Sequence, residues 1–158
     1  MSRAILIAAT LAALALPTAG AMAQEGDAKA GEKVFNRCKT CHMVGEKARN
    51  KIGPMLNNLI GRQAGTVEKY RYSKINKAAG KAGLKWTPEN ITAYLPDPNK
   101  FLKAYLKENG GKAPGRTKMA FRLKKSKDIA NVIAYLKTFS KDAAAGDAKP
   151  KDAAKPKS

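Results

Sequence analysis

The feature that most constrains this chain is the five-residue segment Cys38-Lys39-Thr40-Cys41-His42. It contains both cysteines and the single histidine of the 158 residues. No further cysteine or histidine exists to complete a four-ligand zinc site, and no cysteine remains for a disulfide framework. Hydrolytic chemistry that needs a histidine base would have to use this same histidine. The chemistry open to the chain is therefore concentrated in this one segment.

The C-x-x-C-H spacing is the signature of covalent haem attachment. Two thiols at the end of a helix, expected from Asp27 to about Arg37, can reach both vinyl groups on one porphyrin edge. The adjacent histidine then lies under the iron. A thioredoxin-like pair would need a βαβ context, and the chain shows no alternating strand pattern. A disulfide across two residues would close a tiny loop and stabilise little. We therefore predict one covalently bound haem c.

The second axial position of the iron has a methionine sulfur as its natural candidate, because no second histidine is available. Met43 directly follows His42, and Met55 lies close behind it in a Gly-Pro turn. Met119 lies 77 residues beyond His42, in a basic loop where an apolar residue needs a reason. Ligation is one such reason, and packing over apolar surface is the alternative.

The first 23 residues resemble an export signal in their layout. One arginine precedes an apolar run from Ala4 to Leu16, and small residues end in an A-x-A pattern at Ala21-Met22-Ala23. The run is too short to span a bilayer, and no other stretch is apolar enough. We expect a signal peptide at 1–23, cleavage, and a soluble mature protein in a bacterial periplasm without stable membrane insertion.

Composition divides the remaining chain into a domain at 24–140 and a tail at 141–158. The tail consists almost wholly of Ala, Lys, Asp, Pro and Gly, which predicts disorder. Residues 24–141 hold 26 of the 31 basic residues and 9 of the 12 acidic ones, so the positive charge lies on the domain. Such charge favours an anionic partner. Export and an aromatic content of 6% count against nucleic acid.

Helix signals dominate the domain, so we expect a small all-α protein. Capping residues and helical periodicity predict five helices: Asp27 to about Arg37, Ser73 to about Ala79 with Gly80 ending it, a helix opened by Thr87-Pro88, Asp97-Pro98 to about Glu108, and one from Lys125 or Ser126 to Phe139. The segments 44–72 and 109–125 read as long loops. Short helices and long loops with a thin apolar core imply a large apolar group inside.

With these residues in view, the chain resembles the class I cytochromes c, most closely the bacterial cytochrome c2 group. The likeness covers 24–139, and its most specific marks are C-x-x-C-H and the T-K-M-x-F segment at Met119. It implies that Cys38 and Cys41 form thioethers and that His42 and Met119 are the axial ligands. Pro54 would accept a hydrogen bond from His42 through its carbonyl.

The resemblance also implies roles for residues farther along the chain. Three match positions that contact buried haem propionates: Arg62, Tyr72 and Trp86. A solvated arginine and plain core aromatics are the alternatives. The resemblance further places Tyr94 beside the methionine sulfur, Asn76 and Thr117 in a polar network near it, and Gly31, Phe35 and Tyr135 where the first and last helices cross. It gives no secure mapping from Lys103 to Gly115.

The function implied is one-electron transport without catalysis of a reaction. A monomeric carrier would accept electrons from a bc-type quinol-oxidising complex and deliver them to a photosynthetic reaction centre or a terminal oxidase. A basic rim would dock on acidic surfaces through Lys39, Lys118, Arg116 and Lys124. The alternatives are a haem enzyme or gas-binding protein with an open sixth site, which needs the position of Met119 vacant, and a basic module that binds DNA or membranes without haem.

Overall fold

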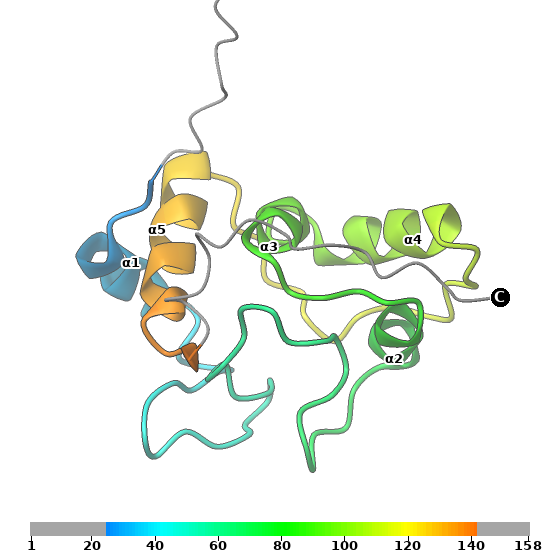
Figure 1. The fold of residues 1–158 in the computed structure, drawn as a ribbon, viewed down its shortest axis with the longest axis horizontal. Helices are drawn as coiled ribbons and strands as arrows, with labels where there is room; N and C mark the ends of the chain where they lie inside the picture. Colours follow the sequence, from blue (N-terminus) through cyan, green and yellow to red (C-terminus); the bar gives the residue numbers. More distant parts are fainter. Residues whose placement is uncertain (1–24, 142–158) are drawn as a thin grey trace, which may run out of the picture.

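The structure is a computed structural model that describes residues 25–141 of the chain (Figure 1). This part contains five helices joined by loops. They are α1 (Ala28–Phe35), α2 (Lys74–Lys81), α3 (Pro88–Tyr94), α4 (Pro98–Glu108) and α5 (Ser126–Lys137). Within residues 25–141 the only β pairing is one isolated antiparallel bridge, between Gln63 and Lys85. The expectation of an all-α domain with long loops is confirmed.

The expected signal peptide at 1–23 lies outside the described residues, and so does the expected tail apart from Lys141. Both assignments therefore stay predictions. Among the described residues, none of the helices combines the length and apolar character needed to cross a bilayer.

Helix starts follow the local capping chemistry that the sequence predicts. The carboxylate of Asp27 accepts hydrogen bonds from the amides of Lys29 and Ala30, at 2.7 and 3.1 Å. The hydroxyl of Thr87 accepts from an amide of α3, and the carboxylate of Asp97 accepts from one of α4. Each cap satisfies an amide that has no partner within its helix.

Helix ends were predicted less well than helix starts. α2 continues through Gly80 to Lys81, and α1 ends at Phe35 before the expected Arg37. Gly80 lies inside α2 and packs against the backbone of Ala64, since a Cβ at this position would lie 1.9 Å from the carbonyl oxygen of Ala64. Phe139 lies beyond α5, which ends at Lys137.

α1 and α5 cross at a steep angle, as expected from the resemblance; in Figure 1 α1 is seen almost end-on beside the upright α5. A Cβ on Gly31 would lie 1.9 Å from the carbonyl oxygen of Asn131, so the two backbones are in direct contact. The rings of Phe35 and Tyr135 pack beside this point with centroids 5.3 Å apart. The amide of Asp27 donates to Asn131 Oδ1 at 2.9 Å, which fixes the start of α1 on α5.

Apolar side chains from the helices and both loops form one cluster. Its most deeply buried members come from α1, α2, α4 and the loops: Phe35, Ile75, Leu84, Leu102, Leu106 and Leu123. From the end of α4 the chain returns as an irregular segment that passes α4 and α3 to reach α5, in yellow in Figure 1. This segment and the loop 36–73 enclose the site described next.

Gly31→Ala tests the crossing of α1 and α5. Helix propensity alone favours alanine by about 0.8–1 kcal/mol, but the added Cβ would overlap Asn131. We expect a net loss of about 2 kcal/mol in the free energy of unfolding, measured by denaturant titration, since overpacking typically costs 1–3 kcal/mol. The exposed neighbour Glu32→Ala is the control and should change stability by less than about 0.5 kcal/mol. A stabilised Gly31→Ala protein would contradict the close packing.

Candidate functional site

A cavity of about 300 Å³ lies among the helices and the long loops. Its lining combines residues from α1, α2, α3, α5 and the long loops. Most of the site residues predicted from the sequence meet there: Cys38, Cys41, His42, Pro54, Arg62, Tyr72, Trp86, Tyr94, Lys118 and Met119. A cavity of this size with a few convergent polar groups is typical of a cofactor site.

The two thiols are positioned by tight turns that continue from α1. The amide of Cys38 donates to Phe35 O at 2.7 Å, and the amides of Cys41 and His42 both donate to Cys38 O, at 3.0 and 2.9 Å. These turns bring both cysteines, which form no disulfide, to the cavity wall. Burial raises the pKa of the Cys38 thiol. The pair can form two covalent bonds to one edge of a group in the cavity.

The imidazole of His42 is fixed in both orientation and tautomer. Its Nδ1 lies 2.7 Å from the carbonyl oxygen of Pro54, and because a carbonyl only accepts, Nδ1 must carry the proton. Burial lowers the pKa of His42, so the ring is held neutral. Gly53 packs on the ring, where a Cβ would lie 2.4 Å from Cε1. The lone pair of Nε2 is therefore free to bind a metal, and the Pro54 contact raises its basicity.

Met119 is the methionine that lines the cavity, whereas Met43 and Met55, the other two within residues 25–141, do not. Its amide donates to Thr117 Oγ1 at 3.2 Å, and that hydroxyl donates to Asn76 Oδ1 at 3.0 Å. The structure thus places one thioether in the same cavity as the imidazole of His42.

Tyr94 lies in the cavity wall and is only 8% exposed. Burial raises its pKa to about 12, so the phenol stays protonated through the neutral range. Its ring meets that of Trp86 edge-on, with centroids 4.8 Å apart. Both side chains are core aromatics and cavity-lining residues at once.

Arg62 is a cation that no anion among the described residues neutralises. Its guanidinium donates to the carbonyl oxygens of Asn57 and Met55, at 2.8 and 3.3 Å. Its Nε is buried without a hydrogen-bond partner from residues 25–141. Burial lowers the pKa of Arg62, although a guanidinium remains charged in proteins. An unsatisfied buried donor beside Tyr72 and Trp86 fits an anionic group entering from the cavity.

The donor set as a whole fits a haem. Two thiols line the cavity and could form thioethers, an imidazole and a thioether could supply two iron ligands, and a guanidinium with a free donor suits a propionate. His/Met ligation is a combination found for haem iron, and it raises the reduction potential.

Of the four predicted docking residues, Lys118 alone lines the cavity. Lys39, Arg116 and Lys124 are exposed and do not line the cavity. Lys118 is exposed and does line it, while its ammonium donates to Arg71 O and lies 5.7 Å from the centre of the Tyr70 ring.

Sequence reasoning missed one conspicuous residue at the cavity, Ile52. This side chain is 70% exposed although it lines the cavity. Its carbonyl accepts from Tyr70 Oη at 2.7 Å, a contact across 18 residues that joins two parts of the long loop. Since Ile52 lies in a loop without periodicity, no sequence signal could have identified it.

Comparisons with known proteins give one consistent result. The family described as Cytochrome c matches residues 28–140. Cytochrome c2 iso-2 of Rhodospirillum centenum is 53% identical over 119 residues, which covers 74% of this chain and 98% of the relative. A cytochrome c2 of Rhodopseudomonas palustris is 46% identical over 135 residues, covering 84% and 92%. A solved cytochrome c2 structure from Rhodospirillum centenum superposes with a TM-score of 0.72 at 54% identity, covering 73% and 99%.

Arg62→Met tests whether an anion neutralises the guanidinium in the haem-bound holoprotein. Methionine keeps much of the side-chain volume and removes the charge. We expect a loss of about 2 kcal/mol in the free energy of unfolding, because charge-assisted hydrogen bonds would be lost. Arg71→Met, at an exposed position, is the control. An equal or higher stability of Arg62→Met would contradict the contact, since removing an unneutralised buried cation should stabilise.

Proposed function

The chain belongs to the cytochrome c family, close to the cytochromes c2, and from this premise we propose how its residues hold and use its one covalently bound haem c. Cys38 and Cys41 would form the thioethers, and His42 and Met119 would supply the two protein ligands of the iron. The observation that supports this most directly is the convergence of these four side chains on one cavity.

The bound haem supplies an iron that cycles between ferric and ferrous. The chain's own residues limit the structural change that accompanies this cycling. The Pro54 carbonyl holds His42 Nδ1–H and so directs Nε2 toward the cavity. The Thr117 hydroxyl holds the Met119 backbone. Buried apolar side chains around them exclude water, so little has to reorganise when an electron moves.

A carrier is favoured over a haem enzyme or gas-binding protein. An open sixth site would need the position of Met119 vacant and an acid–base group beside it. The single histidine of the sequence is already committed to the proximal side. Tyr94, whose pKa is raised to about 12, is a poor proton acceptor at neutral pH. Because the chain belongs to a haem-binding family, a basic module that binds DNA or membranes without haem is also disfavoured.

We assign the carrier to the periplasm, with residues 1–23 as a cleaved signal peptide, 24–140 as the haem domain and 141–158 as a tail outside it. It accepts electrons from a bc-type complex and delivers them to a photosynthetic reaction centre or a terminal oxidase. Lys39, Arg116, Lys118 and Lys124 provide positive charge for brief docking on acidic surfaces. Electrostatic steering of this kind gives the fast, salt-sensitive encounters that a shuttle requires.

The visible spectrum of the holoprotein, with and without carbon monoxide, tests the proposal. We expect a low-spin ferric spectrum with a far-red sulfur-to-iron charge-transfer band and no carbon monoxide binding to the ferrous form. Met119→Ala should lose the band and bind carbon monoxide, whereas Met55→Leu should do neither. Ready binding by the unmodified protein would mean an open iron, and the carrier proposal would then fail.

Charge neutralisation tests the docking residues. A variant with Lys39, Arg116, Lys118 and Lys124 changed to glutamine should react with an isolated bc-type complex about tenfold more slowly at low ionic strength. The difference should shrink in high salt. A control changes four exposed lysines of α1 and α4, Lys29, Lys33, Lys103 and Lys107. If the control slows equally, net charge alone would explain the effect and the assigned residues would be wrong.

A further inference from the structure

The segment that carries Met119 is held almost entirely by side chains. We define the Met119 segment as residues 112–122, which contain no helix or strand. Within residues 25–141 no backbone–backbone hydrogen bond involves any residue of this segment. The first such bond after it joins the amide of Leu123 to the carbonyl of Leu95, at 2.9 Å. The position of a ligand on this segment must therefore depend on other contacts.

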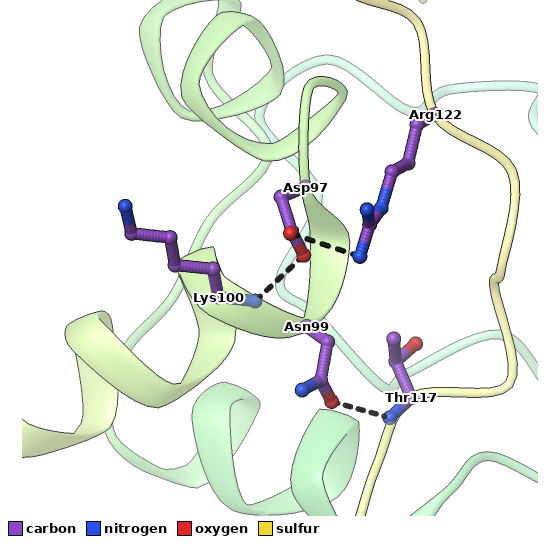
Figure 2. Close-up of polar contacts among 5 residues, drawn as sticks. All are labelled: Asp97, Asn99, Lys100, Thr117 and Arg122. Atoms are coloured by element: carbon purple, nitrogen blue, oxygen red, sulfur yellow. Dashed lines mark hydrogen bonds and ion pairs between the residues drawn. The ribbon is translucent and has the colours of Figure 1, made fainter.

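Two of these contacts come from the start of α4 (Figure 2). Their partners, Thr117 and Arg122, flank Met119 in the sequence. Before Met119, the amide of Thr117 donates to Asn99 Oδ1 at 3.4 Å. After it, the guanidinium of Arg122 pairs with Asp97 Oδ2 at 3.0 Å. The start of α4 therefore holds the segment at one point before Met119 and at one point after it.

The contact through Asn99 continues to the backbone of Met119 itself. Thr117, whose amide meets Asn99, uses its hydroxyl to accept from the Met119 amide at 3.2 Å. The same hydroxyl donates to Asn76 of α2 at 3.0 Å. Asn99 thus fixes the residue that in turn fixes Met119.

Asp97 serves the helix and the segment at the same time. Its Oδ1 caps α4 by accepting from the amide of Lys100 at 3.0 Å, and its Oδ2 binds Arg122. Figure 2 shows the carboxylate lying between these two donors. The hydrogen bond from Lys100 and the charge of Arg122 both lower the pKa of Asp97, with the former first. The carboxylate is therefore ionised at neutral pH.

We propose that Asp97 and Asn99 are positioning residues that hold Met119 at the haem iron. The inference rests on the proposed ligation by Met119. Half-exposed ion pairs contribute little to global stability, and in the Asp97–Arg122 pair the side chain of Arg122 is 50% exposed and that of Asp97 is 33% exposed. We expect their effect to be local, because the Met119 segment makes no backbone–backbone hydrogen bonds with the described part of the chain and weakly bonded segments open separately from a helical core.

Substitutions at both partners in the holoprotein separate positioning from capping. Asp97→Asn keeps the cap of α4, since asparagine caps as well as aspartate, and removes the charge. Arg122→Gln removes the partner, and Arg122→Lys restores its charge. Asn99→Ala removes the contact with Thr117. Asp128→Asn is the matched control, because it breaks the other ion pair of the described residues, Arg37–Asp128 at 3.6 Å, with the same change of charge.

Imidazole added to the ferric holoprotein is the first probe, since it competes with Met119 for the iron. We expect Asp97→Asn, Arg122→Gln and Asn99→Ala to raise imidazole affinity about two- to fivefold, the range of an exposed ion pair. Arg122→Lys should stay near the unmodified protein. The double variant Asp97→Asn/Arg122→Gln should show no more than either single change, because both remove one interaction. Asp128→Asn should not differ from the unmodified protein.

Amide hydrogen exchange is the second probe and does not depend on the sixth ligand. Exchange should accelerate about two- to fivefold at residues 116–123 and remain unchanged in α1 and α5. The inference is overturned if Asp97→Asn matches Asp128→Asn in both measurements, or if exchange rises equally in all helices. Carbon monoxide binding by the unmodified ferrous protein would instead refute the proposed function, and the exchange comparison would still decide whether α4 holds the segment.

Discussion

The crossing of α1 on α5 is the contact from which the rest of the site is built. Gly31 lets the two backbones touch, and Asn131 fixes the start of α1 through the amide of Asp27. Because Cys38 follows α1 through tight turns, this crossing decides where both thiols lie. His42 comes next along the chain and is fixed by Pro54. One interhelical contact thus places the proximal half of the haem site.

The two sides of the site are held by different means. The proximal side depends on backbone turns and one short hydrogen bond to a carbonyl, all within residues 35–54. The distal side depends on side chains that come from α2 and α4 and reach across the chain to the Met119 segment. Backbone turns are rigid, whereas exposed side-chain pairs exchange with water. Under the proposed ligation, the iron would therefore be held by a stiff ligand on the His42 side and a more compliant one on the Met119 side.

Local chemistry was predictable from the residues themselves, whereas contacts across the fold were predictable only where the resemblance to the cytochromes c supplied them, as at the crossing of α1 and α5. The caps at Asp27, Thr87 and Asp97 require only neighbouring residues, and each was predicted correctly. At Gly80 the sequence predicts a helix end, since glycine commonly ends helices. The helix continues because Gly80 packs against Ala64, 16 residues away, and that contact cannot be inferred from the sequence. The C-x-x-C-H motif predicted the cofactor because its parts are contiguous. Residues that act through contacts across the fold, such as Asn99 on Thr117, left no pattern.

The unneutralised guanidinium of Arg62 and the cavity imply that the stability of the folded domain depends on haem attachment. A polypeptide that never received haem would expose the apolar wall of this cavity to water. Without a group to cover it, that wall would contribute little of the apolar burial on which the stability of a small domain depends. Such a chain would spend much of its time unfolded and open to proteases. The same architecture that binds the cofactor thus provides quality control, because only correctly matured molecules persist.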